Sequence, residues 1–458
     1  MPDFRLLAMT EKPVSGSVSE GGLDAPTRLP LDWRKPEFYD THALEKELER
    51  VFDICHGCRR CFSLCNAFPT LFDAIDASPT GDLDGVERKA YWKVVDHCYL
   101  CDMCYMTKCP YVPPHPWNVD FPHLMLRAKA VKYSHGEARL RDRILTSTDA
   151  IGRLAGIPVV AETVNAVNRS VTGRKLLRKT LGVHENAPLP EYHSRSFRRH
   201  ERKRKRPTLE VRATPETRGK VALFVTCYGN RNEPDLALDL VKVFEHNGIA
   251  VALAPREQCC GMPKLELGDL QAIAKLKDAN IRELARLVDE GFDIVAPVPS
   301  CVLMFKQELP LMFADDPAVA KVSERMFDPF EYLMLRHKAG LLRTDFKTAL
   351  GKIAYHVPCH LRVQNIGLKT RDVLKLVPGT DIEVIERCSG HNGTYAVKVE
   401  FHEVSMKIAR PVVQKVAASG ADHYSSDCPM AGHQIENGLE QPRAPEHPLT
   451  LLRIAYGI

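Results

Sequence analysis

The cysteines between positions 55 and 109 constrain this chain more than any other feature of its sequence. Eight of the fifteen cysteines lie there, in two runs. The first run is Cys55, Cys58, Cys61 and Cys65, and the second is Cys98, Cys101, Cys104 and Cys109. Three thiols that recur every third residue can reach one iron–sulfur cube, while the fourth thiol of each run reaches the neighbouring cube. We therefore expect two 4Fe–4S clusters, the first held by Cys55, Cys58, Cys61 and Cys109 and the second by Cys98, Cys101, Cys104 and Cys65.

These spacings are typical of two-cluster ferredoxins, with two departures. Asn66 stands after Cys65 where proline is common, and four residues separate Cys104 from Cys109 where three are usual. A pair of zinc knuckles is the alternative, but zinc needs only four ligands and gains nothing from a third cysteine three residues on. The first residues do not resemble a secretory signal, which argues against disulfides. We expect a cytoplasmic protein, with peripheral attachment to the inner face of the membrane as the alternative.

The order of sequence patterns predicts an α+β multidomain chain. Its 458 residues suffice for about three domains, and no window approaches the roughly 20 consecutive apolar residues of a membrane helix. The net charge of +5 is concentrated in the basic run 195–206, a composition typical of a solvated linker. The expected parts are an extended N-terminal arm (1–42), a helical ferredoxin-like module with two clusters (43–121), a helical connector with a basic linker (122–218), and two tandem α/β repeats with parallel sheets (219–345 and 346–458).

Apolar periodicity places several helices. A helix should start near Thr41, capped by Thr41 or Asp40, because apolar residues recur at positions 44, 48, 51 and 52. Before it, the aromatic segment 33–39 is expected to pack on the cluster module. The span 151–167 is mostly apolar, and we favour a core segment there over a face that lies on a membrane.

From residue 219 onward, short apolar strands alternate with helices, and cysteines follow the strand ends. The pairs Cys227 and Cys359, Cys259 and Cys388, and Cys301 and Cys428 are separated by 132, 129 and 127 residues. Three nearly equal separations indicate an internal duplication. Apolar strands that alternate with helices imply parallel sheets, whose carboxyl edges bind ligands in α/β folds. One long helix is expected over 267–290.

A strand followed by cysteine, then Cys-Cys-Gly, then a third cysteine, twice over and after a two-cluster module, resembles the cysteine-rich CCG-domain family of iron–sulfur oxidoreductases. That family includes heterodisulfide reductase-related proteins and an iron–sulfur subunit of anaerobic glycerol-3-phosphate dehydrogenase. Its disulfide-reducing members use five cysteines per repeat, whereas Met304 and Ala431 stand at the fifth position here. The resemblance implies a site for a third 4Fe–4S cluster at Cys227, Cys259, Cys260 and Cys301.

In repeat two, the resemblance implies a depleted site. Ser389 replaces the second cysteine of the Cys-Cys-Gly motif, which leaves Cys359, Cys388 and Cys428. Three thiolates and one imidazole suit zinc or iron, and the candidates for the imidazole are His360, His391 and His433. Buried cysteines beside hydrogen-bonded histidines, without any metal, are the alternative.

These patterns favour an iron–sulfur electron-transfer subunit of an oxidoreductase complex. By resemblance, it passes electrons between a flavoprotein dehydrogenase or ferredoxin-type partner and a quinone or another acceptor. No glycine-rich phosphate loop precedes a helix, so we expect a flavin or nicotinamide to come from a partner. The alternatives are an iron–sulfur protein that senses oxygen or redox state and a zinc-stapled scaffold. We expect no nucleic-acid binding from the run 195–206 and identify no catalytic residue.

Overall fold

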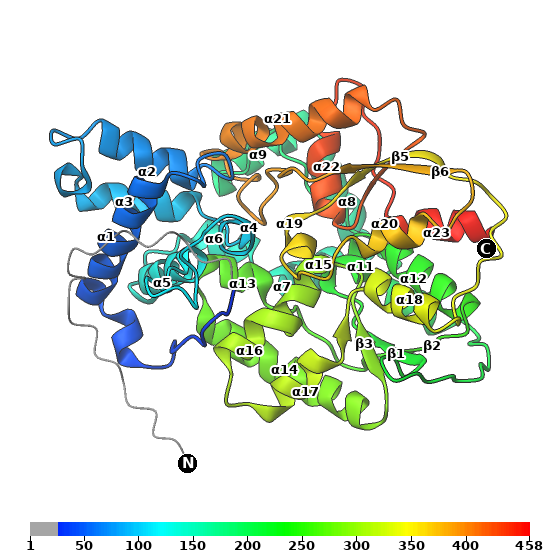
Figure 1. The fold of residues 1–458 in the computed structure, drawn as a ribbon. Coiled ribbons are helices and arrows are strands. Elements are labelled where there is room, and N and C mark those ends of the chain that lie inside the picture. The colour runs from blue at the N-terminus through cyan, green and yellow to red at the C-terminus, as the bar shows by residue number, and fades with distance from the viewer. Residues whose placement is uncertain (1–25) are drawn as a thin grey trace, which may run out of the picture.

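The computed structural model describes residues 26–458, so most of the predicted arm 1–42 lies outside the described residues. Two small parallel sheets stand side by side, with helices around them, and a helical N-terminal part packs against one flank (Figure 1). The structure therefore agrees with the α+β class and shows two α/β units in the C-terminal half.

The N-terminal part is helical. Helix α1 is capped by Asp40, whose carboxylate accepts the Ala43 N–H at 2.6 Å, and its apolar stripe at 44, 48, 51 and 52 is buried as predicted. The elements here are η1 (Pro36–Tyr39), α1 (Thr41–Cys58), α2 (Ala67–Asp76), η2 (Leu83–Gly85), α3 (Arg88–His97), α4 (Met103–Thr107) and α5 (Phe121–Ser134). Helix α5 is buried over most of its length between this part and the first α/β unit.

The prediction that segment 33–39 packs on the cluster module is wrong for Trp33. The Trp33 indole donates to the Met312 carbonyl at 2.9 Å and packs edge-on against Phe313, both in the first α/β unit. An indole needs an apolar surface together with an acceptor, and that pair lies some 280 residues away in the chain. The rest of the segment does pack there: η1 contacts α1 and α5, and Arg127 donates to the Phe38 carbonyl at 2.8 Å and to the Glu37 carbonyl at 2.9 Å.

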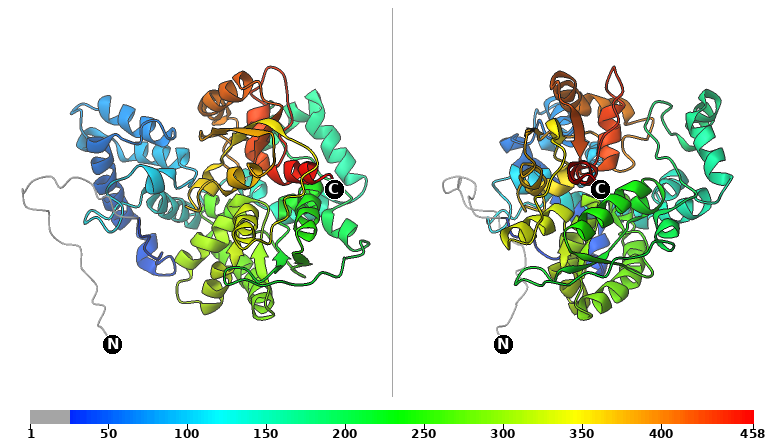
Figure 2. Two further views of the ribbon diagram at one scale, coloured as in Figure 1. Left: turned by 45° about the vertical axis from the view of Figure 1, so that its right-hand side comes forward. Right: turned by 90° about the vertical axis from the view of Figure 1, so that its right-hand side faces the viewer.

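Short helices form the connector. They are α6 (Leu140–Leu145), α7 (Thr148–Ala155), α8 (Val160–Arg169), α9 (Val171–Leu181) and α10 (Phe197–Glu201). In Figure 2, the helices of this segment form an outer layer beside the two α/β units.

The basic run 195–206 is more ordered than a solvated linker. Phe197 is fully buried, and Glu201 is 4% exposed beneath Arg204 and Arg206. Arg204 also pairs with Glu245 at 2.7 Å. The composition of this run did not indicate these ion pairs, because one carboxylate partner lies inside the run and the other lies on a helix far along the chain.

The span 151–167 was expected to be core, and this is wrong for its large side chains. Only its small residues, such as Gly152, Ala155 and Ala161, are buried. Leu154 is 66% exposed and Val159 is 76% exposed. Within residues 26–458, no single helix is long and apolar enough to cross a membrane; α7 and α8 meet those criteria only as a pair bent by 108°.

The first α/β unit holds a parallel sheet in the order β2-β1-β3-β4. The predicted helix over 267–290 is interrupted, because Gly268 takes a φ of 82° and Asp269 then caps a new helix. The elements are β1 (Lys220–Leu223), α11 (Cys227–Arg231), α12 (Pro234–His246), β2 (Ala250–Leu253), α13 (Met262–Leu267), α14 (Leu270–Asp289), β3 (Asp293–Val295), α15 (Pro299–Leu303), η3 (Met304–Glu308), α16 (Leu309–Met312), α17 (Pro317–Glu324), β4 (Met326–Phe327) and α18 (Pro329–Lys338).

The second unit repeats this topology. Its sheet has the order β6-β5-β7, so in both units the first strand lies between the second and the third. The elements are β5 (Gly351–His356), α19 (Cys359–Arg362), α20 (Lys369–Leu374), β6 (Thr380–Ile385), α21 (His402–Ala418), β7 (His423–Ser426), α22 (Pro429–Glu436) and α23 (Pro448–Tyr456). One apolar core joins the units, because α12 packs on α23 and α18 packs on α20.

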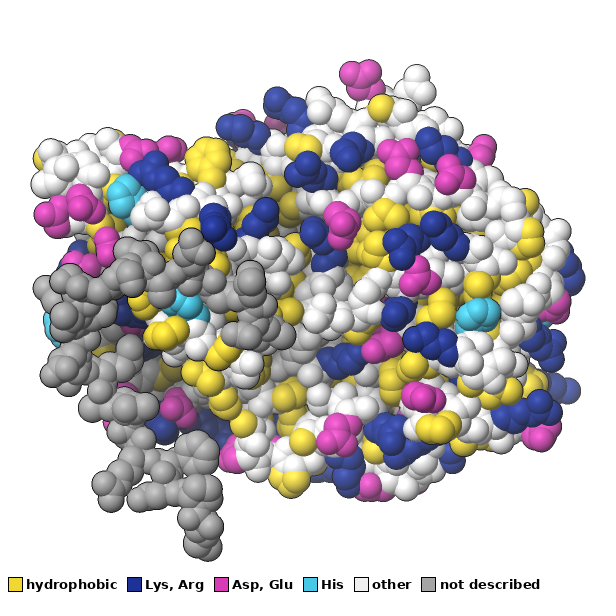
Figure 3. All heavy atoms as spheres, in the orientation of Figure 1, with side chains coloured by type: hydrophobic (Ala, Val, Ile, Leu, Met, Phe, Trp, Pro, Cys, Tyr) yellow, Lys and Arg dark blue, Asp and Glu magenta, His cyan; other side chains and the backbone are white. Residues whose placement is uncertain are grey.

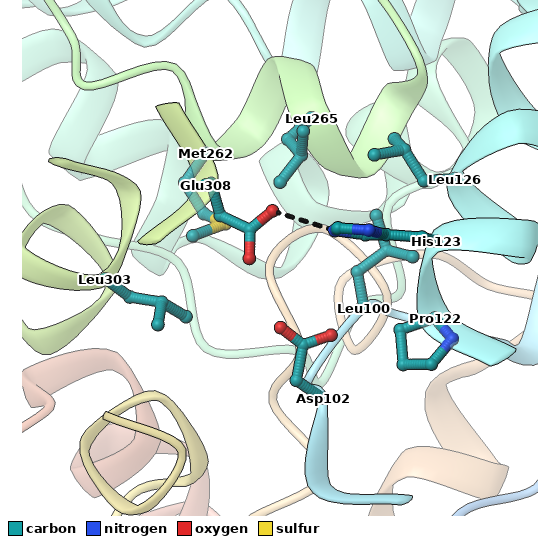
Figure 4. Close-up of a pocket in the computed structure, with 9 residues that line it drawn as sticks. All are labelled: Leu100, Asp102, Pro122, His123, Leu126, Met262, Leu265, Leu303 and Glu308. Carbon is teal, nitrogen blue, oxygen red and sulfur yellow. Dashed lines mark hydrogen bonds and ion pairs between the residues drawn. The ribbon is translucent and has the colours of Figure 1, made fainter. Parts of the chain in front are cut away.

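A buried ion network joins the N-terminal part to the first unit. Arg28 donates to Asp102 at 2.7 Å, to Asp120 at 2.9 Å and to Glu308 at 3.4 Å. His123 lies 3.4 Å from Glu308, and its side chain points toward the Glu308 and Asp102 carboxylates (Figure 4). Burial and Arg28 act to lower the pKa of His123, but Asp120 and Glu308 outweigh them and raise it to about 9. Two cations therefore balance most of the charge of three carboxylates, two of them buried and one, Asp120, partly buried.

Replacing Arg28 tests this network. We expect Arg28→Met to lower the free energy of unfolding by about 3–5 kcal/mol, because it leaves buried carboxylates without their main partner. The matched control is Arg34→Met: its ion pair with Asp315 is exposed, and we expect a change under about 1 kcal/mol. Guanidinium unfolding followed by circular dichroism measures both, and equal changes in the two variants would contradict the assignment.

Candidate functional site

The first group of cysteines gathers around the end of α1. Cys55 and Cys58 occupy its last turn, which ends at Arg59 in the left-handed conformation (φ 49°). Burial raises the pKa of the Cys55 thiol well above its usual value, and Cys61, Cys109 and Cys58 raise it further because they lie close by. Cys109, from the second run, therefore lies with the first run.

The second group forms on the loop between α3 and α4. Leu100 and Asp102 both take left-handed conformations, with φ of 54° and 59°, and these wrap the loop around its cysteines. Burial raises the pKa of the Cys104 thiol, and the nearby thiols of Cys101, Cys98 and Cys65, together with Cys61 of the first group, raise it further. The members of the second group are Cys98, Cys101, Cys104 and Cys65. That either group binds a cluster remains a prediction.

The cysteines of the first α/β unit converge from the carboxyl ends of three strands. Cys227 begins α11 after β1, Cys259 and Cys260 follow β2, and Cys301 lies on α15 after β3. Gly261, with φ of 103°, completes a turn that a side chain would strain. A hydrogen bond from the Cys227 thiol is the largest cause that holds the pKa of Cys259 well below its usual value. Cys260 in turn contacts Cys259 and Cys301, so the four sulfurs form one contiguous set.

The second unit brings together three thiols in the corresponding places. Cys359 begins α19 after β5, Cys388 follows β6, and Cys428 caps α22 after β7. Burial raises the pKa of Cys359, and the nearby Cys388 and Cys428 raise it further. Ser389 is buried at the position of the missing cysteine.

Two tyrosines that the sequence did not single out as site residues join the second cysteine group to the second unit. The Tyr99 hydroxyl, between Cys98 and Cys101, lies 3.6 Å from the Cys388 sulfur. Tyr395 hydrogen-bonds His97 at 2.8 Å through its hydroxyl, and its ring centre lies 5.5 Å from that of Tyr99. The place of Tyr99 inside a Cys-x-x-Cys run is the only sequence signal that could have marked it.

One cavity of about 1170 Å³ connects these sites. It lies between the two α/β units, and Cys101 of the second group also reaches it. The other cysteines in its wall are Cys227, Cys259, Cys260, Cys301, Cys359, Cys388 and Cys428. Three of the four cysteine sets therefore border a single space.

All three predicted histidines line this cavity, but their partners differ. The His360 Nδ1 contacts the Ser300 hydroxyl at 2.8 Å, and burial lowers the pKa of His360. His433 is held between Glu233 at 2.8 Å and Glu436 at 2.9 Å. The Nδ1 of His391 is buried and makes no hydrogen bond to any part of the described chain, and burial lowers its pKa to about 4. Among residues 26–458, no three His, Cys, Asp or Glu side chains surround a point as ligands surround one metal ion.

Comparison with known proteins identifies the family of the two α/β units. The model of the CCG cysteine-rich domain matches residues 221–306 and 353–436, one copy on each α/β unit. Lactate utilization protein A of Bacillus cereus is 30% identical over 217 residues, which cover 46% of this chain and 87% of that protein. The chain belongs to the CCG cysteine-rich domain family.

Two further relatives carry the names of oxidoreductase subunits. One is a subunit of the anaerobic glycerol-3-phosphate dehydrogenase of Escherichia coli, which is 29% identical over 339 residues, 74% of this chain and 82% of that protein. The other is a subunit of the fumarate reductase (CoM/CoB) of Methanothermobacter marburgensis, which is 25% identical over 227 residues, 48% of this chain and 42% of that protein. The resemblance recognised from the sequence is confirmed.

The His433 contacts predict a pH-dependent link between the CCG repeats. Burial lowers the pKa of His433, but Glu233 and Glu436 outweigh it and raise the pKa to about 9. A raised histidine pKa stabilises the fold fully below its usual value of 6.5, and this stabilisation is lost as the pH rises through 9. The His433 side chain is 39% exposed, and solvent screens its ion pairs. We therefore expect the charged histidine to add about 1 kcal/mol to the free energy of unfolding.

The test compares unfolding of the parent and of His433→Gln at pH 6, 7.5 and about 9.5. The difference in free energy of unfolding between the two proteins should shrink as the pH rises. His423→Gln, an ion-paired histidine outside the cavity, is the matched control. A difference that is independent of pH would count against a charged His433.

Proposed function

We propose that this protein is an iron–sulfur electron-transfer subunit of an oxidoreductase complex. Electrons pass from a redox partner through two 4Fe–4S clusters to the CCG repeats, and from there to a quinone or another acceptor. The observation that carries the proposal is the meeting of the second cysteine group with repeat two, where Tyr99 touches Cys388 and Cys101 shares the cavity.

The residues fit this cofactor. A 4Fe–4S cube needs four thiolates that converge, and each of the first two groups supplies three from a segment that contains left-handed residues and a fourth from the other run. The clusters would supply one-electron redox chemistry, while the chain positions the sulfurs and limits access of water. Repeat one offers a third set of four: Cys227, Cys259, Cys260 and Cys301.

Repeat two fits a different site. It has three thiols, and two of its three histidines have partners on both sides: His360 at Ser300 and the Leu100 backbone, His433 between two carboxylates. We propose that Cys359, Cys388 and Cys428 would hold any zinc or iron that binds here, although the three thiols do not surround one point as they lie in this structure. Such a site differs from that of repeat one, and a heterodisulfide-cleaving role is disfavoured because neither repeat supplies five cysteines.

The electron donor is a partner protein, which we propose to be a flavoprotein dehydrogenase. Glycerol-3-phosphate dehydrogenase and fumarate reductase, whose subunits resemble this chain, are named for reactions on small organic substrates. The chain carries no phosphate-binding loop of its own for a flavin or nicotinamide. In this proposal the partner oxidises the substrate, and this chain transfers the electrons.

The connector supports attachment to a membrane surface. The exposed large apolar side chains of the described residues are concentrated between 140 and 176. They are Leu140, Leu154, Ile157, Val159, Val160, Val167, Val171 and Leu176. Arg153, Lys175 and Lys179 are exposed on the same helices. Apolar side chains beside basic ones are the composition of helices that lie in an anionic membrane interface.

The alternatives have weaker support. A sensor that binds nucleic acid needs free basic groups, but Arg198 pairs with Glu257 and Arg204 pairs with Glu201 and Glu245. On the face shown in Figure 3, basic and acidic side chains are interspersed rather than separated. A zinc-stapled scaffold would use the same thiols, and it would yield a colourless protein that carries only zinc.

Metal analysis tests the proposed electron transfer through iron–sulfur clusters. Protein purified without oxygen should carry at least about eight iron atoms per chain and give a low-temperature paramagnetic signal when reduced. Cys104→Ser should lose about four irons, because it removes one ligand of one cube. Ser63→Ala, exposed inside the first run, should lose none. Zinc without iron, or fewer than about eight irons, would refute the proposal.

Flotation with vesicles tests attachment. We expect the protein to float with vesicles that contain phosphatidylglycerol and to be released at high salt, which screens the basic side chains. Leu154→Asp with Val171→Asp should abolish flotation, because carboxylates oppose insertion of the apolar face. Val211→Asp, exposed outside this segment, should not. Flotation that is equal in all variants would exclude this face as the attachment site.

A further inference from the structure

The loop between Cys58 and Cys65 presents an exposed aromatic side chain beside the first cysteine group. We infer that the surface formed by Arg60, Phe62 and Lys108, the entry face, is where an acidic flavoprotein docks and delivers electrons. This inference rests on the proposed electron-transfer function, and it adds where the donor binds and what chemistry the surface of that donor has.

Phe62 is the centre of the entry face. It is 56% exposed, and among residues 26–458 no other phenylalanine, tyrosine or tryptophan is classed as exposed. Its ring stacks on that of Phe72 in α2, with ring centres 6.4 Å apart and planes 10° apart. This stack holds the exposed ring in place before any partner arrives. An aromatic side chain that is fixed in this way is the typical anchor of a protein–protein interface.

Two basic side chains flank the ring. Arg60 and Lys108 are exposed, and neither makes an ion pair with any part of residues 26–458. Burial and the neighbouring thiols raise the pKa of Cys61 to about 12, while Lys108 and Arg60 act to lower it. Both cations therefore lie near this one sulfur, although they come from separate cysteine runs. Arg59 adds no free charge, because it pairs with Asp76 at 2.5 Å.

Compensation of the thiolate charge of a cluster is the competing explanation for these cations. It accounts for Arg60 and Lys108 but not for Phe62, because an exposed apolar ring does nothing for a charge. An aromatic centre with charged residues at its rim is the composition of an interface, and complementary charge makes the partner acidic. Interfaces between electron-transfer proteins are among the smallest, so one anchored ring and two cations suffice to guide docking.

The position of the first group supports electron entry here. Its four cysteines are all partly exposed, whereas Cys98 and Cys104 of the second group are buried. The second group in turn contacts repeat two, through Tyr99 and Cys388. Helix α2, which carries Phe72, lies at the far end of the molecule from the two sheets (Figure 1). A donor on the entry face therefore meets the first group and leaves the CCG repeats free for the acceptor.

The test measures how fast reduced flavodoxin, an acidic protein that carries a flavin, reduces the iron-replete, full-length protein without oxygen. One electron leaves the flavin hydroquinone and enters a cluster, and no bond forms or breaks. We expect the second-order rate constant to fall as salt is added, because salt screens the opposite charges. Phe62→Ser should lower the rate constant about tenfold at every salt concentration, because it removes the anchor of the interface.

Charge reversal supplies the second arm. Arg60→Glu combined with Lys108→Glu should lower the rate constant about tenfold at low salt and much less at high salt. The matched control is Arg202→Glu combined with Lys203→Glu. It changes the net charge equally, at exposed positions outside the entry face, and should stay within about twofold of the parent. Reduced methyl viologen, a small cation that needs no docking surface, should react no more slowly with any variant.

Several outcomes would overturn the inference. They are equal losses in the two charge-reversed pairs, a rate constant unchanged in both Phe62→Ser and the entry-face pair, and a parent that viologen reduces but flavodoxin does not. Loss of iron from both Arg60→Glu and Lys108→Glu as single variants would show that these charges hold a cluster, and would also overturn it. If only one of the two loses iron, the other single variant carries the test.

The iron content of the parent separates this inference from the proposed function. A parent without clusters refutes the proposed electron transfer. A parent whose clusters are reduced equally fast in every entry-face variant refutes this docking surface alone.

Discussion

The structure depends on holding together thiols that have no attraction for one another. All of these thiols are buried or partly buried, and the pKa values of thiols such as Cys55 and Cys104 are raised by burial and by neighbouring sulfurs. Only rigid backbone can enforce such closeness. Left-handed residues at 100 and 102 wind one loop, and the ends of parallel strands converge in the CCG repeats. The rest of the fold supports these few turns.

Duplication explains why the sites face a common space. Both repeats have the same strand order, and one apolar core joins them through α12, α18, α20 and α23. Two like sheets joined in this way bring their carboxyl edges to one cavity. The repeats then diverged in their chemistry, because Ser389 leaves repeat two with three thiols. Equivalent scaffolds thus present four thiols from one repeat and three from the other to the same cavity.

Local patterns in the sequence predicted much of this architecture. The apolar stripe of α1, the strands at 220–223 and 351–356 and the repeat of cysteine separations all depend on neighbours in the chain. Features that depend on distant residues were missed. Trp33 finds its acceptor across the molecule, Tyr99 meets Cys388 from another module, and the two-residue strand β4 has almost no pattern of its own. The span 151–167 has the apolar composition of a core segment, yet its large side chains are exposed. Composition alone does not determine whether another part of the chain packs on a helix.

The three candidate histidines show the same limit of prediction from sequence. His360, His391 and His433 were equivalent candidates in the sequence, since each follows a cysteine closely. The structure separates them by their partners: the Ser300 hydroxyl for His360, two carboxylates for His433, and for the Nδ1 of His391 no partner among the described residues. Arg28 adds a consequence for the contact between the modules. Its carboxylate partners lie 74, 92 and 280 residues away, on two modules, so its binding site exists only after those modules have met. Arg28 therefore has its full set of partners only where the two modules are in contact, so this one side chain reports whether they are joined.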